Sequence, residues 1–327
     1  MKHFLLLGAG FSRNWGGWLA DEVGNYLLSR SSVRNNPTVR AAIGRHVNAG
    51  FEAALSEFQE VYRREKSAAA KRDVDDMQTA VLQMFQTMDE AFRETPFEFQ
   101  NEIRFLVRTF LIRFDAIFTL NQDYLLERHY LDQNVLLGSA GRWQGWRIPG
   151  MVPVHDPARQ PLDPAPVLWK PDPKGFHIDR KYQSYVKLHG SSNWVTNEGE
   201  RLLIIGSNKL ARIQGLDVLR SAFETFRESL AAPARLMIIG YGFRDDHVNH
   251  VLLDAARREQ LQLFIIDELG AKALDQNNRT RGASIYVPSE LHETLSPMLI
   301  GASRRRLSET FNRDRVEHSM VMSFFES

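Results

Sequence analysis

Cysteine is absent from this sequence of 327 residues. Its absence excludes disulfide bonds, thiolate nucleophiles and every zinc site that depends on cysteine ligands. Long hydrophobic runs are missing too. Only four consecutive apolar residues, 4–7, precede Gly8, which is too short for a signal-peptide core, and no later run is long enough to span a membrane. We therefore expect a cytoplasmic protein that makes no contact with a membrane.

The sequence also lacks an excess of charge of either sign. Its 41 basic and 40 acidic residues leave a formal net charge of +1, so no general field attracts nucleic acid or an anionic membrane. The densest basic run, Arg304-Arg305-Arg306, is typical of a solvated surface, and we expect no direct binding of nucleic acid. The hydrophobic content of 43% is enough for a large buried core.

Six short apolar segments are predicted to be buried β-strands, because each is a continuous apolar run rather than an alternation of polar and apolar residues. Nearly all end in a small or polar residue and precede a helical pattern, which favours parallel strands joined by crossover helices. The predicted fold class is α/β, a Rossmann-like parallel sheet flanked by helices. The six segments are residues 4–7, 116–120, 185–188, 202–205, 236–239 and 263–266.

Two long segments interrupt the predicted sheet. Residues 31–101 carry apolar residues at helical spacing and are predicted to form a helical insertion subdomain. Its methionine stripe, Met77, Met84 and Met88, is typical of a helix face packed in a core. Residues 139–181 hold eight of the thirteen prolines together with three tryptophans, and they predict an ordered loop. This loop is either a structural crossover or a lid near a ligand.

The predicted domain organisation follows from these segments. We expect one catalytic domain over residues 1–290, interrupted by the helical insertion and by the proline-rich loop. Residues 291–327 are expected to form a C-terminal extension. No internal repeat is apparent.

Parallel α/β sheets bind ligands beyond the carboxyl ends of their strands, so the residues that follow each strand are the candidate site. The first strand leads into Gly8-Ala9-Gly10-Phe11-Ser12. Glycines let the backbone approach a pyrophosphate, and a helix start supplies oriented N–H donors. Arg13 stands in the place of the third glycine of the dinucleotide fingerprint, and no Gly-Lys-Ser/Thr follows, which excludes a P-loop.

The second and third strands also end in polar residues. Thr119-Leu120-Asn121-Gln122-Asp123 follows the second, and its Asn and Asp either cap the next helix or face a ligand. Lys187-Leu188-His189-Gly190-Ser191 ends the third. A histidine at this position, with a glycine directly behind it, is either exposed to the ligand crevice or buried and satisfied.

Gly240-Tyr241-Gly242 follows the fifth strand, and Asp245 or Asp246 is suited to cap the next helix. The sixth strand ends in Asp267, a position suited to a ribose hydroxyl or an adenine edge. Four residues of types that can ligate a metal lie in a cluster nearby. Consecutive residues on a helix point in different directions, and no third well-spaced ligand is evident, so we expect no metal site. That cluster consists of Asp246, His247, His250 and Asp254.

The order of these motifs is more specific than any one of them. Gly-Ala-Gly-x-Ser, Thr-x-Asn-x-Asp, Lys-Leu-His-Gly-Ser and Gly-Tyr-Gly-x-x-Asp follow one another along the chain. This series resembles the sirtuin-like family, and in particular the bacterial branch whose members hydrolyse NAD in antiphage defence. The resemblance extends over residues 1–30 and 102–270, and leaves out the helical insertion and the tail.

The resemblance implies that NAD is bound as a substrate and that Asn121 and His189 are catalytic, with His189 as the base. Asn121 and Asp123 would line the pocket of the nicotinamide ribose, and Asp267 would lie beyond the adenosine. The implied NAD-binding set is Gly8, Ala9, Gly10, Phe11, Ser12, Thr119, Asn121, Asp123, Gly240, Tyr241, Gly242 and Asp267.

Two departures separate this chain from the deacylating sirtuins that it resembles. Those enzymes carry a four-cysteine zinc module between the Asn-x-Asp and His-Gly motifs, where this chain has its proline-rich segment, so no zinc is expected. They also carry a Gly-Ile-Pro-Asp-Phe-Arg loop after the first motif, which residues 13–18 do not reproduce. Both departures argue against binding of an acyl-lysine peptide and leave NAD binding intact.

The expected function is therefore an NAD+ glycohydrolase that yields nicotinamide and ADP-ribose and acts in antiphage defence by NAD depletion. Two alternatives stay open: a non-catalytic module that senses NAD or ADP-ribose, and an NAD-dependent protein deacylase. The resemblance also suggests a homo-oligomer, restrained until a trigger arrives. It further suggests a partner such as a HerA-type ATPase or an Argonaute-like protein.

Overall fold

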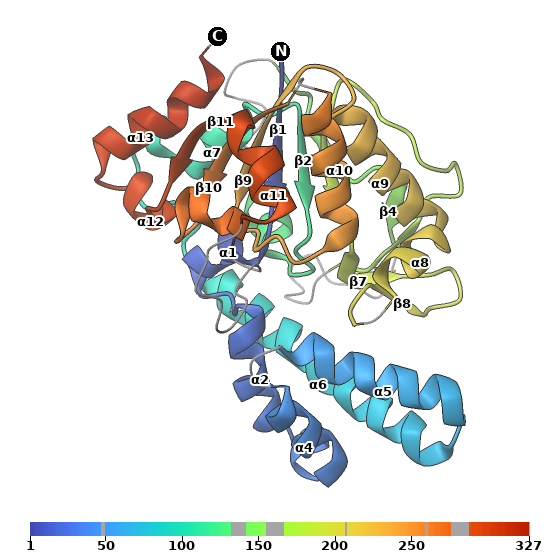
Figure 1. Ribbon diagram of the computed structural model, residues 1–327. Helices are drawn as coiled ribbons and strands as arrows, with labels where there is room; N and C mark the ends of the chain where they lie inside the picture. Colours follow the sequence, from blue (N-terminus) through green and yellow to red (C-terminus); the bar gives the residue numbers. More distant parts are fainter. Residues whose placement is uncertain are drawn as a thin grey trace.

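A seven-stranded parallel sheet forms the centre of the molecule, with helices on both faces and an arm of helices beyond the carboxyl ends of its strands (Figure 1). The computed structural model describes residues 1–46, 50–131, 142–154, 167–206, 208–258, 261–275 and 288–326. Within these ranges no helix has the length and apolar character that a membrane crossing requires.

The strand order is β11-β10-β9-β1-β2-β6-β3, and every neighbouring pair is parallel. The first strand therefore lies in the middle, with later strands added on both of its sides, which is a doubly wound order. The predicted Rossmann-like parallel sheet flanked by helices is confirmed. The strands are β1 (Lys2–Leu7), β2 (Ala116–Thr119), β3 (Trp146–Arg147), β6 (Gln183–Lys187), β9 (Ala234–Ile239), β10 (Leu261–Ile266) and β11 (Leu299–Ser303).

Both faces of the sheet are covered because successive side chains of each strand point to opposite faces and almost all are apolar. In β1, Phe4 and Leu6 belong to one hydrophobic core, and Leu5 and Leu7 belong to the other. The first core contains helices α9 (Asp217–Ser229), α10 (Asp246–Arg257) and α11 (Glu290–Leu295). The second contains α7 (Val107–Leu111), α12 (Leu307–Thr310), α13 (Arg315–Met322) and the helices of the insertion.

A helical insertion is present, as predicted, and forms the arm at the carboxyl ends of the strands (Figure 1). The arm begins at α2, before the predicted start at residue 31. Met77, Met84 and Met88 are buried, so the methionine stripe is a core face as predicted. Ser67 caps the longest helix, because its hydroxyl accepts from the backbone N–H of Ala70 at 3.1 Å. The arm holds α2 (Ala20–Leu28), α3 (Ser31–Arg34), α4 (Pro37–Arg45), α5 (Phe51–Glu65) and α6 (Ala68–Glu94).

The described parts of the proline-rich segment include the short strands β3, β4 and β5. One of them, β3, pairs with β6 at the margin of the main sheet. The others join a second, four-stranded sheet of order β4-β5-β7-β8, made of β4 (Met151–Pro153), β5 (Trp169–Pro171), β7 (Gly190–Val195) and β8 (Arg201–Leu203). The indole N–H of Trp143 donates to the carbonyl of Ile112 at 3.0 Å, which ties this segment to the rest of the fold.

One predicted strand belongs to a different sheet. Residues 202–205 were expected to form a parallel strand, but β8 pairs antiparallel with β7 in the smaller sheet. Only residues 196–200 separate the two strands, which is enough for a hairpin turn and far too short for the crossover that a parallel pair needs. The prediction was wrong because β7, the partner strand, was not predicted. Its polar run Ser191-Ser192-Asn193 does not resemble a buried strand.

The edge strand β11 was not anticipated from the sequence. Its residues Leu299–Ser303 range from exposed Ile300 to buried Ser303. They include Gly301, where a Cβ would lie 2.4 Å from the ring of Phe264. The strand is therefore recognisable only from its packing against β10 and not from a continuous apolar run.

Phe118→Ala is expected to lower the free energy of unfolding by about 3–5 kcal/mol. Phe118 is fully buried in β2, and its ring packs against Phe4 and Phe226 at centroid distances of 6.0 and 4.9 Å. Urea denaturation measures the loss. Val316→Ala is the matched control, because Val316 is 82% exposed and its truncation should change stability by less than about 0.5 kcal/mol. Equal stabilities of the two variants would contradict this account of the core.

Candidate functional site

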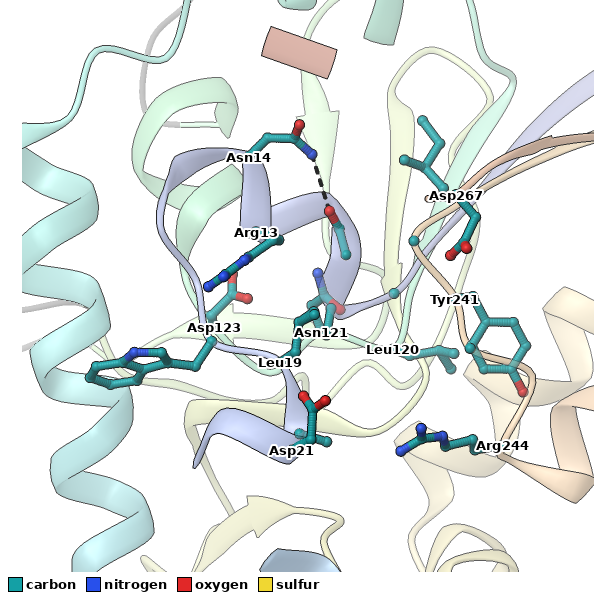
Figure 2. A pocket seen from close by; sticks show the side chains of 18 of the residues that line it. Arg13, Asn14, Leu19, Asp21, Leu120, Asn121, Asp123, Tyr241, Arg244 and Asp267 are labelled. Carbon is teal, nitrogen blue, oxygen red and sulfur yellow. Dashed lines mark hydrogen bonds between the residues drawn. The ribbon is translucent and has the colours of Figure 1, made fainter. Parts of the chain in front are cut away.

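A cavity of about 670 Å³ lies at the carboxyl edge of the sheet. Its walls include the segments that follow β1, β2, β6, β9, β10 and β11, and residues of α5 and α6 close it from the arm. The strand order reverses between β1 and β9, so the cavity sits at the topological switch point, where open α/β sheets bind ligands. Figure 2 shows Asn121 and Asp123 on one side of it and Tyr241 and Asp267 on the other.

Two glycine loops meet at the base of the cavity. The N–H of Gly8 donates to the carbonyl of Ile239 at 3.0 Å, and the N–H of Gly10 donates to the carbonyl of Gly240 at 2.9 Å. A Cβ on Gly10 would lie 2.6 Å from the Cα of Gly240, which has a φ of +62°. Only glycine allows this approach, so these residues are required for contact between the two loops as well as for any approach to a ligand.

Asn121 lines the cavity and is held in place by two buried hydroxyl groups. Its side-chain N–H₂ donates to the hydroxyl of Ser12 at 3.1 Å, and its backbone N–H donates to the hydroxyl of Thr119 at 3.0 Å. Ser12 and Thr119 are both buried. Ser12 therefore orients the side-chain amide of Asn121, and Thr119 fixes its backbone. The side-chain oxygen is the acceptor that Asn121 can offer to a ligand.

A buried ion pair lies below Asp123. The ammonium of Lys187, which is fully buried, contacts the carboxylate of Glu127 and donates to the carbonyl of Asp123 at 2.7 Å and to the hydroxyl of Ser191 at 2.8 Å. Three acceptors thus satisfy the three protons of the ammonium. Burial raises the pKa of the Asp123 carboxyl, and the charge of Lys187 opposes this shift.

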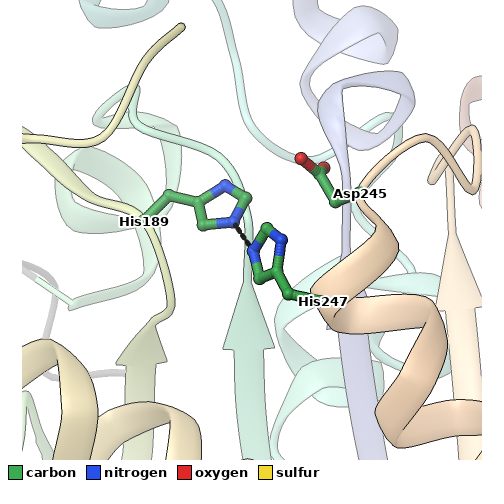
Figure 3. Close-up of side chains that lie close together, drawn as sticks. All are labelled: His189, Asp245 and His247. Atoms are coloured by element: carbon green, nitrogen blue, oxygen red, sulfur yellow. Dashed lines mark hydrogen bonds between the residues drawn. The ribbon is translucent and has the colours of Figure 1, made fainter. Parts of the chain in front are cut away.

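His189 faces a second histidine. Its Nε2 lies 2.8 Å from Nε2 of His247, which comes from the first turn of α10 (Figure 3). Burial lowers the pKa of His189 to about 3 and also lowers that of His247. Both rings are therefore neutral at physiological pH, and one nitrogen of the facing pair must donate a hydrogen to the other.

Lys209 joins the arm to the sheet at this side of the cavity. Its ammonium lies 2.7 Å from Glu52 of α5 and 2.8 Å from Asp245, which precedes α10. Burial favours the neutral form of Asp245, but the charge of Lys209 and its hydrogen bond help to bring the pKa of this carboxyl below the usual value. Asp245 does stand at the helix start, as predicted, yet its side chain caps no backbone N–H and binds Lys209.

The opposite end of the cavity combines Asp267 with the arginine run. The carboxylate of Asp267 accepts from the backbone N–H of Leu269 at 2.9 Å, and burial raises the pKa of this carboxyl. Arg304, Arg305 and Arg306 are exposed, as expected for a solvated run, and they also line the cavity. Their position beside the cavity was not predicted, because β11 that precedes them was not recognised.

Most of the predicted site residues come together in this one cavity. Phe11, Ser12 and Thr119 do not line it. Phe11 packs in the core with its ring 5.1 Å from that of Trp15, and the other two residues support Asn121. The predicted residues that line the cavity are Gly8, Ala9, Gly10, Asn121, Asp123, His189, Gly240, Tyr241, Gly242 and Asp267.

Sequence reasoning missed Lys209, Glu52 and the pairing of His247 with His189. No local motif marks Lys209 or Glu52, because their contacts join a helix of the arm to a loop of the sheet. His247 was noticed only as part of a helix-surface cluster. Its partner in the site, His189, lies 58 residues earlier in the chain.

Together, the doubly wound parallel sheet and the cavity at its switch point define a Rossmann-like α/β protein. Within that class, residues 115–286 match the SIR2-like domain family. The match spans more than half of the chain, and the chain belongs to this family. Membership supports an NAD-related function of the sirtuin type.

Comparison with individual proteins adds little to this assignment. No curated protein matches the sequence. Among solved structures, the chain is similar to the crystal structure of Sir2 in complex with the inhibitor EX-527, 2'-O-acetyl-ADP-ribose and a deacetylated p53 peptide. The TM-score is 0.39 at 10% sequence identity, over 98% of this chain and 95% of that chain.

Gly10→Ala is expected to destabilise the protein by about 1–3 kcal/mol, because the added Cβ would push the two glycine loops apart. Thermal and urea denaturation measure the change. Gly44→Ala is the matched control: Gly44 lies in α4 with open space around its Cα, and alanine there should stabilise the helix by about 0.5–1 kcal/mol. A Gly10→Ala protein as stable as the wild type would show that the loops are not in close contact.

Proposed function

We propose that this protein is an NAD+ glycohydrolase, which cleaves the bond between nicotinamide and ribose to give nicotinamide and ADP-ribose. The observation that carries the proposal is that Asn121 and His189 line one cavity at the switch point of a SIR2-like fold. A volume of about 670 Å³ suits a dinucleotide, since cofactor and ligand sites usually enclose about 300–1,000 Å³.

In the proposed complex NAD spans the cavity. The adenosine half lies toward Tyr241 and Asp267, where a carboxylate can accept a hydrogen bond from a ribose hydroxyl. The phosphates lie near the glycine loops after β1 and β9. The nicotinamide ribose lies toward Asn121, Asp123 and His189, which places the scissile bond at the buried end of the cavity.

The proposed reaction requires few catalytic groups. The nicotinamide ring of NAD+ is positively charged while it is bonded to ribose, and it departs as a neutral molecule. No acid is therefore needed to protonate it. The main energetic barrier is formation of an oxocarbenium-like ribose. Positioning of the ribose and exclusion of stray water supply acceleration. Asn121 orients the ribose or the attacking water, and the neutral His189 accepts a proton from water or a ribose hydroxyl.

The histidine pair decides which nitrogen of His189 accepts the proton. Nε2 of His189 is engaged by Nε2 of His247. When Nε2–H of His189 donates across this contact, Nδ1 keeps its lone pair and serves as the base. In this arrangement His247 holds His189 in the tautomer that the reaction requires.

Hydrolysis is favoured over deacylation because the chain has no cysteine with which to build the zinc module of deacylating sirtuins.

The proposal includes a role in antiphage defence by NAD depletion, with activity restrained in the uninfected cell. It also includes homo-oligomers and a partner such as a HerA-type ATPase or an Argonaute-like protein. Phage challenge of cells that carry the wild-type or Asn121→Ala gene, with NAD measured over time, tests this role.

Asn121→Ala and His189→Ala are each expected to lower the turnover of NAD by about a hundredfold or more, because each removes a group aimed at the reacting ribose. Chromatography of released nicotinamide measures the effect. The matched controls are Asn101→Ala and His250→Ala, which change exposed residues that do not line the cavity. Thermal denaturation of every variant checks that the fold is retained.

Two outcomes would contradict this mechanism. One is hydrolysis that persists in both Asn121→Ala and His189→Ala. The other is wild-type protein that binds NAD in calorimetry but releases no nicotinamide, either alone or with the proteins encoded beside its gene. The second outcome would favour a sensing module.

The rate of NAD hydrolysis is expected to stay nearly constant between pH 7.5 and 5.5, falling less than about twofold. A histidine of ordinary pKa, about 6.5, would lose about tenfold through protonation over this range. Because burial lowers the pKa of His189 to about 3, its base form persists. The unfolded chain binds the proton that this ring excludes, so stability falls as the pH drops below about 6.5. Circular dichroism in the same buffers therefore checks that the protein stays folded. A tenfold loss of the hydrolysis rate while the protein is still folded contradicts the prediction.

A further inference from the structure

The histidine pair beside the cavity has a third neighbour that can ligate a metal ion. Ligand atoms of His189, Asp245 and His247 all lie within 4.8 Å of one another. Figure 3 shows the three side chains converging from the end of β6 and the start of α10. This ligand set could not be recognised from the local sequence around His247, because His189 lies 58 residues away and meets it only in the folded protein.

We propose that His189, His247 and Asp245 form a binding site for a divalent transition-metal ion of the zinc class. Two imidazole nitrogens and one carboxylate oxygen are a ligand set that Zn²⁺ accepts. Three protein ligands leave a fourth position for water. His189 and Asp245 line the cavity, so this position and the path of entry are open to it.

The distance between the two rings fits this site after a small movement. Metal–nitrogen bonds of about 2.0–2.1 Å place two tetrahedral ligands about 3.3 Å apart. The two Nε2 atoms are 2.8 Å apart, so each ring needs to move by only about a quarter of an ångström. The contact between them is also replaceable, since a metal ion satisfies both nitrogens at once.

The local charge favours a cation. Two carboxylates lie close to the rings, one on Asp245 and the other on Glu52. Lys209 is the nearby positive charge, and it lies between Asp245 and Glu52. Two carboxylates and one ammonium leave a net charge of about −1 beside the rings. Lys209 contacts one oxygen of Asp245, Oδ1, and the other oxygen can face the ion.

Occupancy would switch off the proposed reaction, and this consequence rests on the function proposed above. A metal ion on Nε2 of His189 forces the remaining proton of the ring onto Nδ1. The proton moves within the ring, so none is released and no other group changes its protonation. With Nδ1 protonated and Nε2 coordinated, His189 has no lone pair left to act as a base.

Metal binding is tested on the whole protein, freed of metals with a chelator and titrated with Zn²⁺ in a calorimeter. We expect one ion per chain, and binding at least about tenfold weaker in His247→Gln and in Asp245→Asn. His250→Gln is the matched control, because His250 is exposed on the same helix, and it should bind as the wild type does. Thermal denaturation checks the fold of each variant.

A second measurement uses Co²⁺, whose visible absorption reports a four-coordinate environment. The wild type should show this spectrum, and His247→Gln should not. If neither ion binds the wild type more tightly than His247→Gln, the proposal is overturned and the two histidines form a hydrogen-bonded pair only. The wild-type spectrum decides the question even if a variant fails to fold.

Inhibition is measured separately. Equimolar Zn²⁺ should reduce NAD hydrolysis by the wild type at least about tenfold, and a chelator should restore it. Binding of Zn²⁺ without inhibition would overturn the switch and leave the metal site in place. Absence of hydrolysis in metal-free protein would count against the proposed function, while the calorimetry and the spectrum still decide the metal site.

Discussion

The contact between the glycine loops after β1 and β9 is the constraint on which the site depends. Their hydrogen bonds, Gly8 to Ile239 and Gly10 to Gly240, extend the pairing of the two strands past the end of the sheet. The loops are thereby held together at the place where the strand order reverses. Ser12, which supports Asn121, follows the first loop, and α10, which carries His247, follows the second. A small change in this backbone contact would move both sides of the cavity at once.

Charges around the cavity occur in groups that compensate one another. Lys187 is satisfied by Glu127 and two neutral oxygens, and Lys209 lies between Glu52 and Asp245. The buried pair of Lys187 and Glu127 contributes little net stability, but removal of one partner would leave the other charge buried and unpaired. The group around Lys209 is only partly buried. The groups therefore act mainly to hold the loops and the arm in place.

The sequence predicted the sheet well where the strands are fully buried, because a continuous apolar run followed by a small residue is a local signal. Residues 4–7, 236–239 and 263–266 all fall in parallel strands as expected. Failures came where the signal is not local. Strand β7 is polar, and β11 is recognised only by its packing on Phe264. The same holds for the site: glycines, Asn121 and His189 stand in motifs, whereas Lys209 and Glu52 take part only through contacts between distant segments.

The position of β1 has a consequence for any fragment chosen by homology. The family match covers residues 115–286, whereas β1 ends at Leu7 and occupies the middle of the sheet between β9 and β2. A polypeptide trimmed to the matched region would lose the strand that joins its two halves. It would contain β2, β6 and β3 as one strip and β9 and β10 as another, each with an unpaired inner edge. The recognisable part of this protein is thus not a self-sufficient folding unit, and the cavity belongs to the complete sheet alone.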